Sequence, residues 1–165
     1  MVDGWCFARA VAIFDHCPIM ELRQLSPADI EPTIELMVLL NPQCPSTELR
    51  ERYLHILERH AADYHCIGCW SDGQLIGLSG AWIMTKVWCG KYLEVDHLIV
   101  HPSQRLRGAA SMMLQHWQGV ATAEQCNIVV LDSYTSNFDS HRLYHKHGFE
   151  IWGFHFVKSL RDFHH

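Results

Sequence analysis

The segment from Tyr92 to Trp117 constrains the fold more than any other part of this sequence. It opens with a mostly apolar, β-branched run over residues 92–100, which predicts a strand and contains the carboxylates Glu94 and Asp96. Apolar residues then recur at helical spacing from Ala110 onward. A strand that passes through a short turn into an amphipathic helix predicts an α/β arrangement around a shared core.

The turn between this strand and this helix carries two arginines and a glycine, Arg105, Arg107 and Gly108. The first amides of a helix have no partner within the helix and lie at the positive end of its dipole, so this turn predicts an anion site, most naturally for phosphate. The alternative is a helix start whose small residues only permit close packing. No Gly-Lys-Ser/Thr follows the glycine and no Gly-x-Gly-x-x-Gly is present, which excludes two common phosphate motifs.

The next segment is expected to complete a right-handed βαβ unit. Residues 127–132 form a nearly continuous apolar run, typical of a strand that is covered on both faces and lies parallel to the first. A helix then begins at Ser136 or Asn137 and ends at Gly148, a residue suited to the left-handed helix stop. The other predicted elements are an edge strand over 20–25, helices after Ser26 and Ser46, a hairpin of 64–70 and 74–84 around Asp72-Gly73, and a last strand over 149–157.

Length and composition indicate one globular domain. The chain has 165 residues, of which 48% are hydrophobic and 19% charged, and we assign residues 20–165 to the domain and residues 1–19 to an extension of unknown role. A net charge of −5 argues against a nucleic-acid partner and suits a cationic small molecule. Seven cysteines without a secretory signal indicate free thiols and a cytoplasmic protein, and no apolar run reaches membrane-spanning length.

Two motifs resemble those of one enzyme family. The spacing Arg105-x-x-Gly108-x-Ala110 is similar to the acyl-CoA pyrophosphate loop of the GNAT superfamily of N-acyltransferases, Q/R-x-x-G-x-G/A. The stretch from Asn137 to Phe149 resembles the family pattern N-x-x-A-x-x-F-Y-x-K-x-G-F, with Ser140 for alanine and Leu143 for phenylalanine. The resemblance extends from about residue 20 to the C-terminus. It implies a mixed central sheet of six to seven strands with helices on both faces, in which two splayed parallel strands form the acyl-CoA cleft.

The resemblance also implies acetyl-CoA as the cosubstrate, with no metal. The backbone of Leu98, Ile99 and Val100 would pair with the pantetheine arm, which Asn137 would also contact. Tyr144 would lie near the thioester sulfur and protonate the leaving thiolate. The pyrophosphate would be held by the backbone amides of Arg105, Leu106, Arg107, Gly108, Ala109, Ala110 and Ser111.

The reaction needs an uncharged amine, so a base must remove a proton from it. Glu94 and Asp96 share one strand parity and could both face the acceptor, and both stay candidates. Asp96 matches the acidic position of polyamine-type family members, whereas Glu94 matches the general base of histone-type members; the alternative for either is a structural ion pair. His97 has the opposite parity and is interpreted as a core histidine, unless a β-bulge reverses this inference. Trp88 is expected to line the acceptor site.

We therefore expect an N-acetyltransferase that acts on the primary amine of a small, cationic acceptor such as a polyamine, by direct attack on acetyl-CoA. Alternatives are a regulatory module of the same fold that only binds acyl-CoA, and a protein or peptide N-acetyltransferase. A metal or redox site at Cys66 and Cys69 is a further alternative, although these residues would point to opposite faces of one strand. Neither nucleic acid nor a membrane is an expected partner, and a homodimer is possible.

Overall fold

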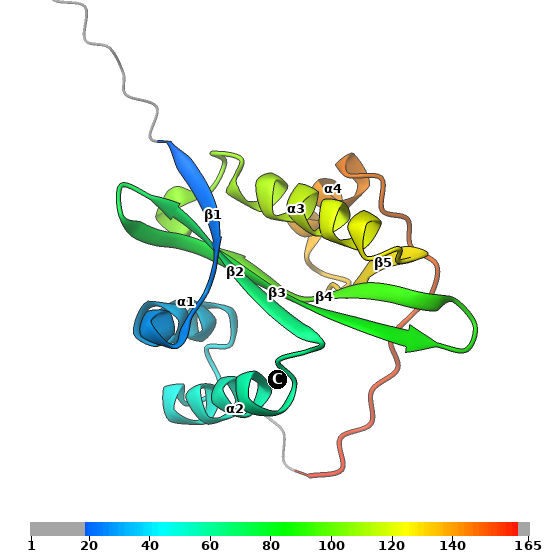
Figure 1. Ribbon diagram of the computed structural model, residues 1–165, viewed down its shortest axis with the longest axis horizontal. Helices are drawn as coiled ribbons and strands as arrows, with labels where there is room; N and C mark the ends of the chain where they lie inside the picture. Colours follow the sequence, from blue (N-terminus) through cyan, green and yellow to red (C-terminus); the bar gives the residue numbers. More distant parts are fainter. Residues whose placement is uncertain (1–18, 162–165) are drawn as a thin grey trace, which may run out of the picture.

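The computed structural model describes residues 19–161 and contains one five-stranded mixed sheet (Figure 1). The strands lie in chain order, and every neighbouring pair is antiparallel except the last, in which β4 and β5 are parallel. The predicted βαβ connection is therefore confirmed. The strands are β1 Met20–Gln24, β2 Tyr64–Ser71, β3 Gln74–Lys86, β4 Gly90–Val100 and β5 Ile128–Leu131.

Helices cover both faces of the sheet, as expected (Figure 1). Helices α1 Ile30–Leu40 and α2 Ser46–Arg59 lie on one face, and α3 Ala109–Ala123 and α4 Phe138–Lys146 lie on the other. Two short 3-10 turns, η1 Pro27–Asp29 and η2 Pro102–Gln104, precede α1 and follow β4. We call the two sides of the sheet the α1/α2 face and the α3 face.

Each face has its own hydrophobic core. The α1/α2 face buries Ile34, Met37, Tyr53, Tyr64 and Leu78 among others, and the α3 face buries Leu93, Val95, Ala109, Met113 and Trp117 among others. The apolar stripe that was predicted to begin at Ala110 lies on α3, on the side that is buried against the sheet. Because β4 lies between these two cores, each side chain on this strand points toward one face or the other.

The turns and helix ends that are predicted from local sequence are present in the structure. Asp72 and Gly73 adopt positive φ values of 50° and 75° in the hairpin that joins β2 to β3. Asn137 caps α4 through its side chain, which accepts a hydrogen bond from the Ser140 amide at 3.3 Å. Gly148 has φ of 81° just after α4 and ends it in the left-handed conformation.

The strand predicted over residues 149–157 is wrong, and with it the count of six to seven strands. Residues 149–158 form neither helix nor strand, and β5 is the last strand in the described part of the chain. Strand β5 has only four residues, which offers a short edge for pairing. Nδ1 of His155 contacts Oδ2 of Asp132 at 2.6 Å, so this segment is held just past the end of β5. The large apolar side chains that are exposed in residues 149–161 are Ile151, Trp152, Phe154, Phe156, Val157 and Leu160.

The N-terminal extension expected over residues 1–19 lies outside the described residues, apart from Ile19. The first strand of the sheet begins at Met20. None of the helices within residues 19–161 has both the length and the apolar character needed to cross a membrane.

Candidate active site

Strand β4 extends beyond its parallel partner. Its pairing with β5 ends where Val95 lies opposite Leu131, but β4 itself continues to Val100. Strand β3 covers one edge of this extension, and among the described residues no strand covers the other. An uncovered strand edge offers backbone donors and acceptors to an extended ligand. The predicted pantetheine-binding residues Leu98, Ile99 and Val100 therefore lie on this uncovered edge, beyond the end of β5.

A β-bulge lies where this uncovered edge begins. Gly80 of β3 pairs with His97 and Ala81 pairs with Val95, so Asp96 is the additional residue in β4. Such a residue locally alters the alternation of side chains along the strand. As a result His97 lies on the α1/α2 face, beside Cys66 and the Tyr64 ring. The β-bulge, which was left open as an alternative, therefore reverses the face expected for His97 from strand parity. The side chain is still that of a largely buried, hydrogen-bonded histidine, as interpreted.

Buried hydrogen bonds fix the bulge from the other side of the sheet. The Ser79 hydroxyl, which is fully buried, donates to the carbonyl oxygen of His97 at 2.8 Å. The same hydroxyl accepts a hydrogen bond from Nε1 of Trp117 at 2.9 Å. Helix α3 thus holds the backbone of β4 at the bulge, and an unpaired polar group in this position would be costly.

His97 and Asp96 form a hydrogen-bonded pair at the bulge. Nδ1 of His97 lies 3.1 Å from Oδ2 of Asp96, and Nε2 lies 3.8 Å from Sγ of Cys66. The His97 side chain is 12% exposed, whereas that of Asp96 is 45% exposed. Burial alone would lower the pKa of His97, but hydrogen bonds to Asp96 and Cys66 outweigh it and raise this pKa from 6.5 to about 9. The imidazole is therefore a cation at neutral pH, and the carboxylate is the member of the pair that solvent reaches.

Glu94 has a different partner. Its carboxylate lies 3.7 Å from Nζ of Lys86, too far for a good hydrogen bond, and the two side chains are 29% and 48% exposed. An exposed pair of this kind contributes little to stability. Across the sheet Glu94 lies opposite Trp82, whose ring packs 4.8 Å from that of Tyr64. The two candidate carboxylates therefore share the α1/α2 face but differ in their partners.

The predicted anion loop leads from β4 into α3. Leu106 and Gly108 have φ values of 65° and 92°, and residues 105–108 are exposed. Helix α3 begins at Ala109, so its first-turn amides, which include those of Ala110 and Ser111, have no acceptor within the helix. Within the described part of the chain, neither Arg105 nor Arg107 forms an ion pair with a carboxylate. The loop thus has the free amides and free guanidinium groups that an anion site requires.

Helix α4 carries the second motif, Asn137 and Tyr144. The side-chain oxygen of Asn137 is already used as the helix cap, so only its amide group is left to reach a ligand. Tyr144 is half-buried, with its ring 6.1 Å from that of Phe149; burial raises its pKa and a hydrogen bond with Ser140 acts in the opposite direction. Nothing in the described residues joins Tyr144 to Glu94 or Asp96 by a hydrogen bond.

The start of α3 and the end of α4 are also connected. Nε2 of His147 lies 3.0 Å from the hydroxyl of Ser111, and Nε2 of Gln118 donates to the carbonyl oxygen of His147 at 3.2 Å. The two motifs are 25 or more residues apart in sequence, yet these contacts bring the start of α3 beside the end of α4, where the second motif finishes. This juxtaposition supports treating them as parts of one site.

A family model for the acetyltransferase (GNAT) family matches residues 33–149, which include both motifs and most of the sheet. The chain belongs to the GNAT family of acetyltransferases. It is accordingly an acyltransferase with the GNAT fold, and the resemblance found in the sequence is confirmed. No curated relative matches it.

Solved structures agree with this GNAT assignment at the level of the fold. The chain is similar to the aminoglycoside N-acetyltransferase AAC(6')-Iy in complex with CoA, at 24% identity and a TM-score of 0.77, over 87% of this chain and 96% of that one. A complex of AAC(6')-Iy with a bisubstrate analogue, CoA-S-monomethyl-acetylneamine, gives 24% identity and a TM-score of 0.76 over 87% and 99%. A ribosomal-protein-alanine N-acetyltransferase from Brucella melitensis biovar Abortus 2308 has 20% identity to this chain. Its TM-score is 0.72, over 86% of this chain and 100% of that one.

Trp88, the remaining residue that was predicted to contact the substrate, lies apart from Glu94 and Asp96. It sits with Val87 in the turn between β3 and β4, and both side chains are largely exposed. The rings that do lie near the Asp96–His97 pair are Tyr64, 6.3 Å from His97 between ring centres, and Trp82 next to Tyr64. Sequence reasoning missed Tyr64, which is buried and gives no local signal of a role in the site.

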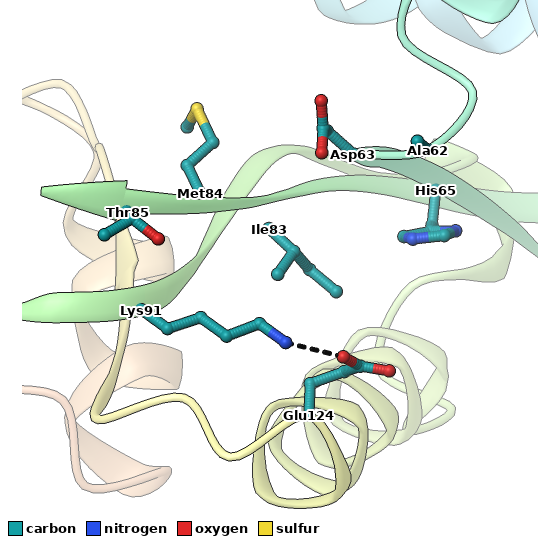
Figure 2. A pocket seen from close by; sticks show the side chains of 8 residues that line it. All are labelled: Ala62, Asp63, His65, Ile83, Met84, Thr85, Lys91 and Glu124. Carbon is teal, nitrogen blue, oxygen red and sulfur yellow. Dashed lines mark hydrogen bonds and ion pairs between the residues drawn. The ribbon is translucent and has the colours of Figure 1, made fainter.

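A cavity of about 700 Å³ lies elsewhere, and Figure 2 shows the side chains that line it. Lys91 and Glu124 form an ion pair of 2.7 Å across it, and none of the predicted site residues takes part. Glu124 follows the C-terminal end of α3, whereas the anion loop precedes its N-terminal end, about 20 Å away at 1.5 Å per residue. This cavity is therefore separate from the predicted acyl-CoA loop. Its other lining residues are Ala62, Asp63, His65, Ile83, Met84 and Thr85.

The structure separates the two cysteines proposed as an alternative metal or redox pair. Cys66 belongs to the core of the α1/α2 face and Cys69 to the core of the α3 face, and both are buried. Alternation along β2 therefore directs them apart, as the sequence predicts. Burial of Cys66 also argues against a role as a nucleophile, although it neighbours His97.

Proposed function

We propose that this acetyltransferase transfers the acetyl group of acetyl-CoA to the primary amine of a small, cationic acceptor. The observation that carries the proposal is the continuous path along β4: a bulge with an exposed carboxylate, then an uncovered strand edge, then a loop with free amides. These three parts match, in order, the acceptor amine, the pantetheine arm and the pyrophosphate. The complex of AAC(6')-Iy with CoA supports acetyl-CoA as the cosubstrate.

The residues present suit acetyl-CoA. The edge at Leu98, Ile99 and Val100 would hydrogen-bond the pantetheine, and the side-chain amide of Asn137 would approach the same arm. A Cβ at Gly108 would meet no other atom within 4 Å, so packing within the protein does not require a glycine there. The glycine is explained instead by its φ of 92° and by the room that it leaves for a ligand. The amides from Arg105 to Ser111 would cradle the pyrophosphate, with the two exposed arginines adding positive charge.

The acceptor is expected to be a cation because its surroundings are acidic and aromatic. Glu94 and Asp96 lie on one face with the half-buried ring of Trp82, a combination that suits an organic ammonium group. The chain's net charge of −5 acts in the same direction. The complex of AAC(6')-Iy with the bisubstrate analogue CoA-S-monomethyl-acetylneamine supports a small-molecule acceptor. Trp88 would contact only the outer part of a longer acceptor.

In the proposed reaction Asp96 acts as the base. The N–H bond of the acceptor ammonium breaks, the proton passes to a carboxylate oxygen of Asp96, and the freed electron pair attacks the thioester carbonyl carbon. The tetrahedral intermediate collapses with cleavage of the C–S bond, and the thiolate takes a proton from the phenol of Tyr144. We prefer Asp96 to Glu94 because it lies where β4 becomes uncovered, whereas Glu94 precedes this point and faces Lys86.

A turnover screen tests this proposal. The untagged protein is mixed with acetyl-CoA and one amine at a time, and CoA release and the mass of the acetylated product are measured. The panel contains polyamines, aminoglycosides, amino acids and peptides with a free N-terminus. We expect many turnovers with polycationic small amines and few with neutral ones. Turnover confined to peptides would contradict the acceptor class, and tight acetyl-CoA binding without transfer to any amine would contradict the proposed reaction.

A further inference from the structure

His97 has no part in the reaction as proposed above, yet it is the most buried charged group near the site. Titratable groups from two strands lie against it, Asp96 from β4 itself and Cys66 and the Tyr64 ring from β2. A Cβ built at Gly80 of β3 would overlap Cε1 of His97 and the hydroxyl oxygen of Tyr64. The imidazole therefore packs directly on the backbone of β3, in a place that only glycine leaves open.

This packing gives the ring one orientation. Nε2 faces Sγ of Cys66 in the core, and Nδ1 faces Oδ2 of Asp96 toward solvent. The backbone on which the ring stands is also held, because the buried Ser79 hydroxyl donates to the His97 carbonyl oxygen. An exposed aspartate normally samples several rotamers, but this one has a rigid donor on one of its two oxygens.

We propose that His97 is a positioning residue for Asp96: its Nδ1–H donates to one carboxylate oxygen, which leaves the other oxygen directed at the acceptor amine. This inference rests on the proposed function, since it assigns Asp96 to the amine. Correct orientation matters because a small displacement of a reacting group has a large effect on rate, on the order of 10²-fold for about 1 Å.

The charge of His97 adds a pH dependence to this arrangement. With a pKa of about 9, the ring is an imidazolium at neutral pH and competes with a cationic amine for the carboxylate. As the pH rises through 9 the ring loses its charge, the Nδ1–H donor remains, and Asp96 can pair fully with the ammonium group. The value of kcat/KM for the amine therefore rises through a step near pH 9, in addition to any step from the amine itself.

Two amide substitutions separate positioning from packing. In His97→Asn the side-chain NH2 replaces the Nδ1–H donor, and in His97→Gln it reaches the place of Nε2 instead. We expect His97→Gln to lower kcat/KM for the best amine by about 10²-fold and His97→Asn to restore most of this loss. Affinity for acetyl-CoA, measured by calorimetry, stays at the wild-type value in both. The step in kcat/KM near pH 9 is absent from both variants. Because all proteins are compared with the same amine, the titration of the amine itself affects them equally.

An NMR titration tests the pair without turnover. The chain has thirteen histidines, and the signal of His97 is the one that is absent from the spectrum of His97→Asn. We expect this imidazole to titrate near pH 9 in the wild type and at a markedly lower pH in Asp96→Asn. An unchanged titration in Asp96→Asn would overturn the pair. Equal kcat/KM values and pH profiles for His97→Gln and the wild type would overturn the positioning role. Failure of the proposed function looks different: no amine is acetylated by the wild type, while the His97 titration still depends on Asp96.

Discussion

The two ends of the uncovered β4 edge are built in different ways. The loop that follows it, residues 105–111, offers backbone amides, and its exposed side chains contact little of the protein. The bulge that precedes it offers side chains, and these are held by groups from β2, β3 and α3, namely Cys66, Gly80, Ser79 and Trp117. The loop therefore depends on backbone conformation and the bulge on tertiary packing. It follows that changes in the loop should alter cosubstrate affinity, whereas changes at the bulge should alter the rate with the amine.

The largest expected effect belongs to the loop. Replacing Gly108 by valine forces a β-branched residue into a φ of 92° and places a side chain where the pyrophosphate would approach the amides. We expect acetyl-CoA binding, measured by calorimetry, to be abolished while the fold persists, because a Cβ meets no other atom there. The matched control is Gly119→Val in α3, which also has open space but no positive φ. Wild-type affinity in a folded Gly108→Val protein would contradict the loop assignment.

The next effect belongs to the bulge and compares the two carboxylates. Asp96→Asn removes the proposed base and should lower kcat at neutral pH by ~10²–10⁴-fold, with partial recovery at high pH where free amine is abundant. Glu94→Gln removes only an exposed ion pair with Lys86 and should change kcat by a few-fold at most. Acetyl-CoA affinity should remain in both variants. The reverse ranking of the two variants would assign the base to Glu94, and no effect of either would leave proton removal to water.

Among the residues that are given a role in the reaction, the smallest expected effect on rate belongs to Tyr144, which lies at neither end of the edge. Phenylalanine keeps the ring and its contact with Phe149, so the variant should lose about 1 kcal/mol of stability at most. A thiolate is a fairly good leaving group, and the expected loss in single-turnover rate is therefore at the low end of the general-acid range, ~10²-fold. Single-turnover measurement avoids masking by product release. If the rate stays within a few-fold of wild type, Tyr144 is only a wall of the cleft.

Local signals explain what could be predicted from the sequence. The hairpin around Asp72-Gly73, the strand–turn–helix unit and the cap at Asn137 each depend on residues that are neighbours in the chain, and each formed. The same holds for Gly108, whose conformation is a property of its own backbone. Family membership followed because its motifs are of this local kind. The prediction of a last strand over 149–157 failed because a strand requires a partner edge, and local alternation cannot provide one.

Periodicity and short backbone motifs were enough to predict the order of most elements, the turn with positive φ before α3 and the acetyltransferase family. The residues that surround Asp96 could not be predicted in this way, because they come from neighbouring strands. The extra residue in β4 is defined by the register with β3, in which Gly80 lies opposite His97 and Ala81 opposite Val95. That register is set by packing between strands and by the buried bond from Ser79, so the parity of His97 could not be counted from β4 alone.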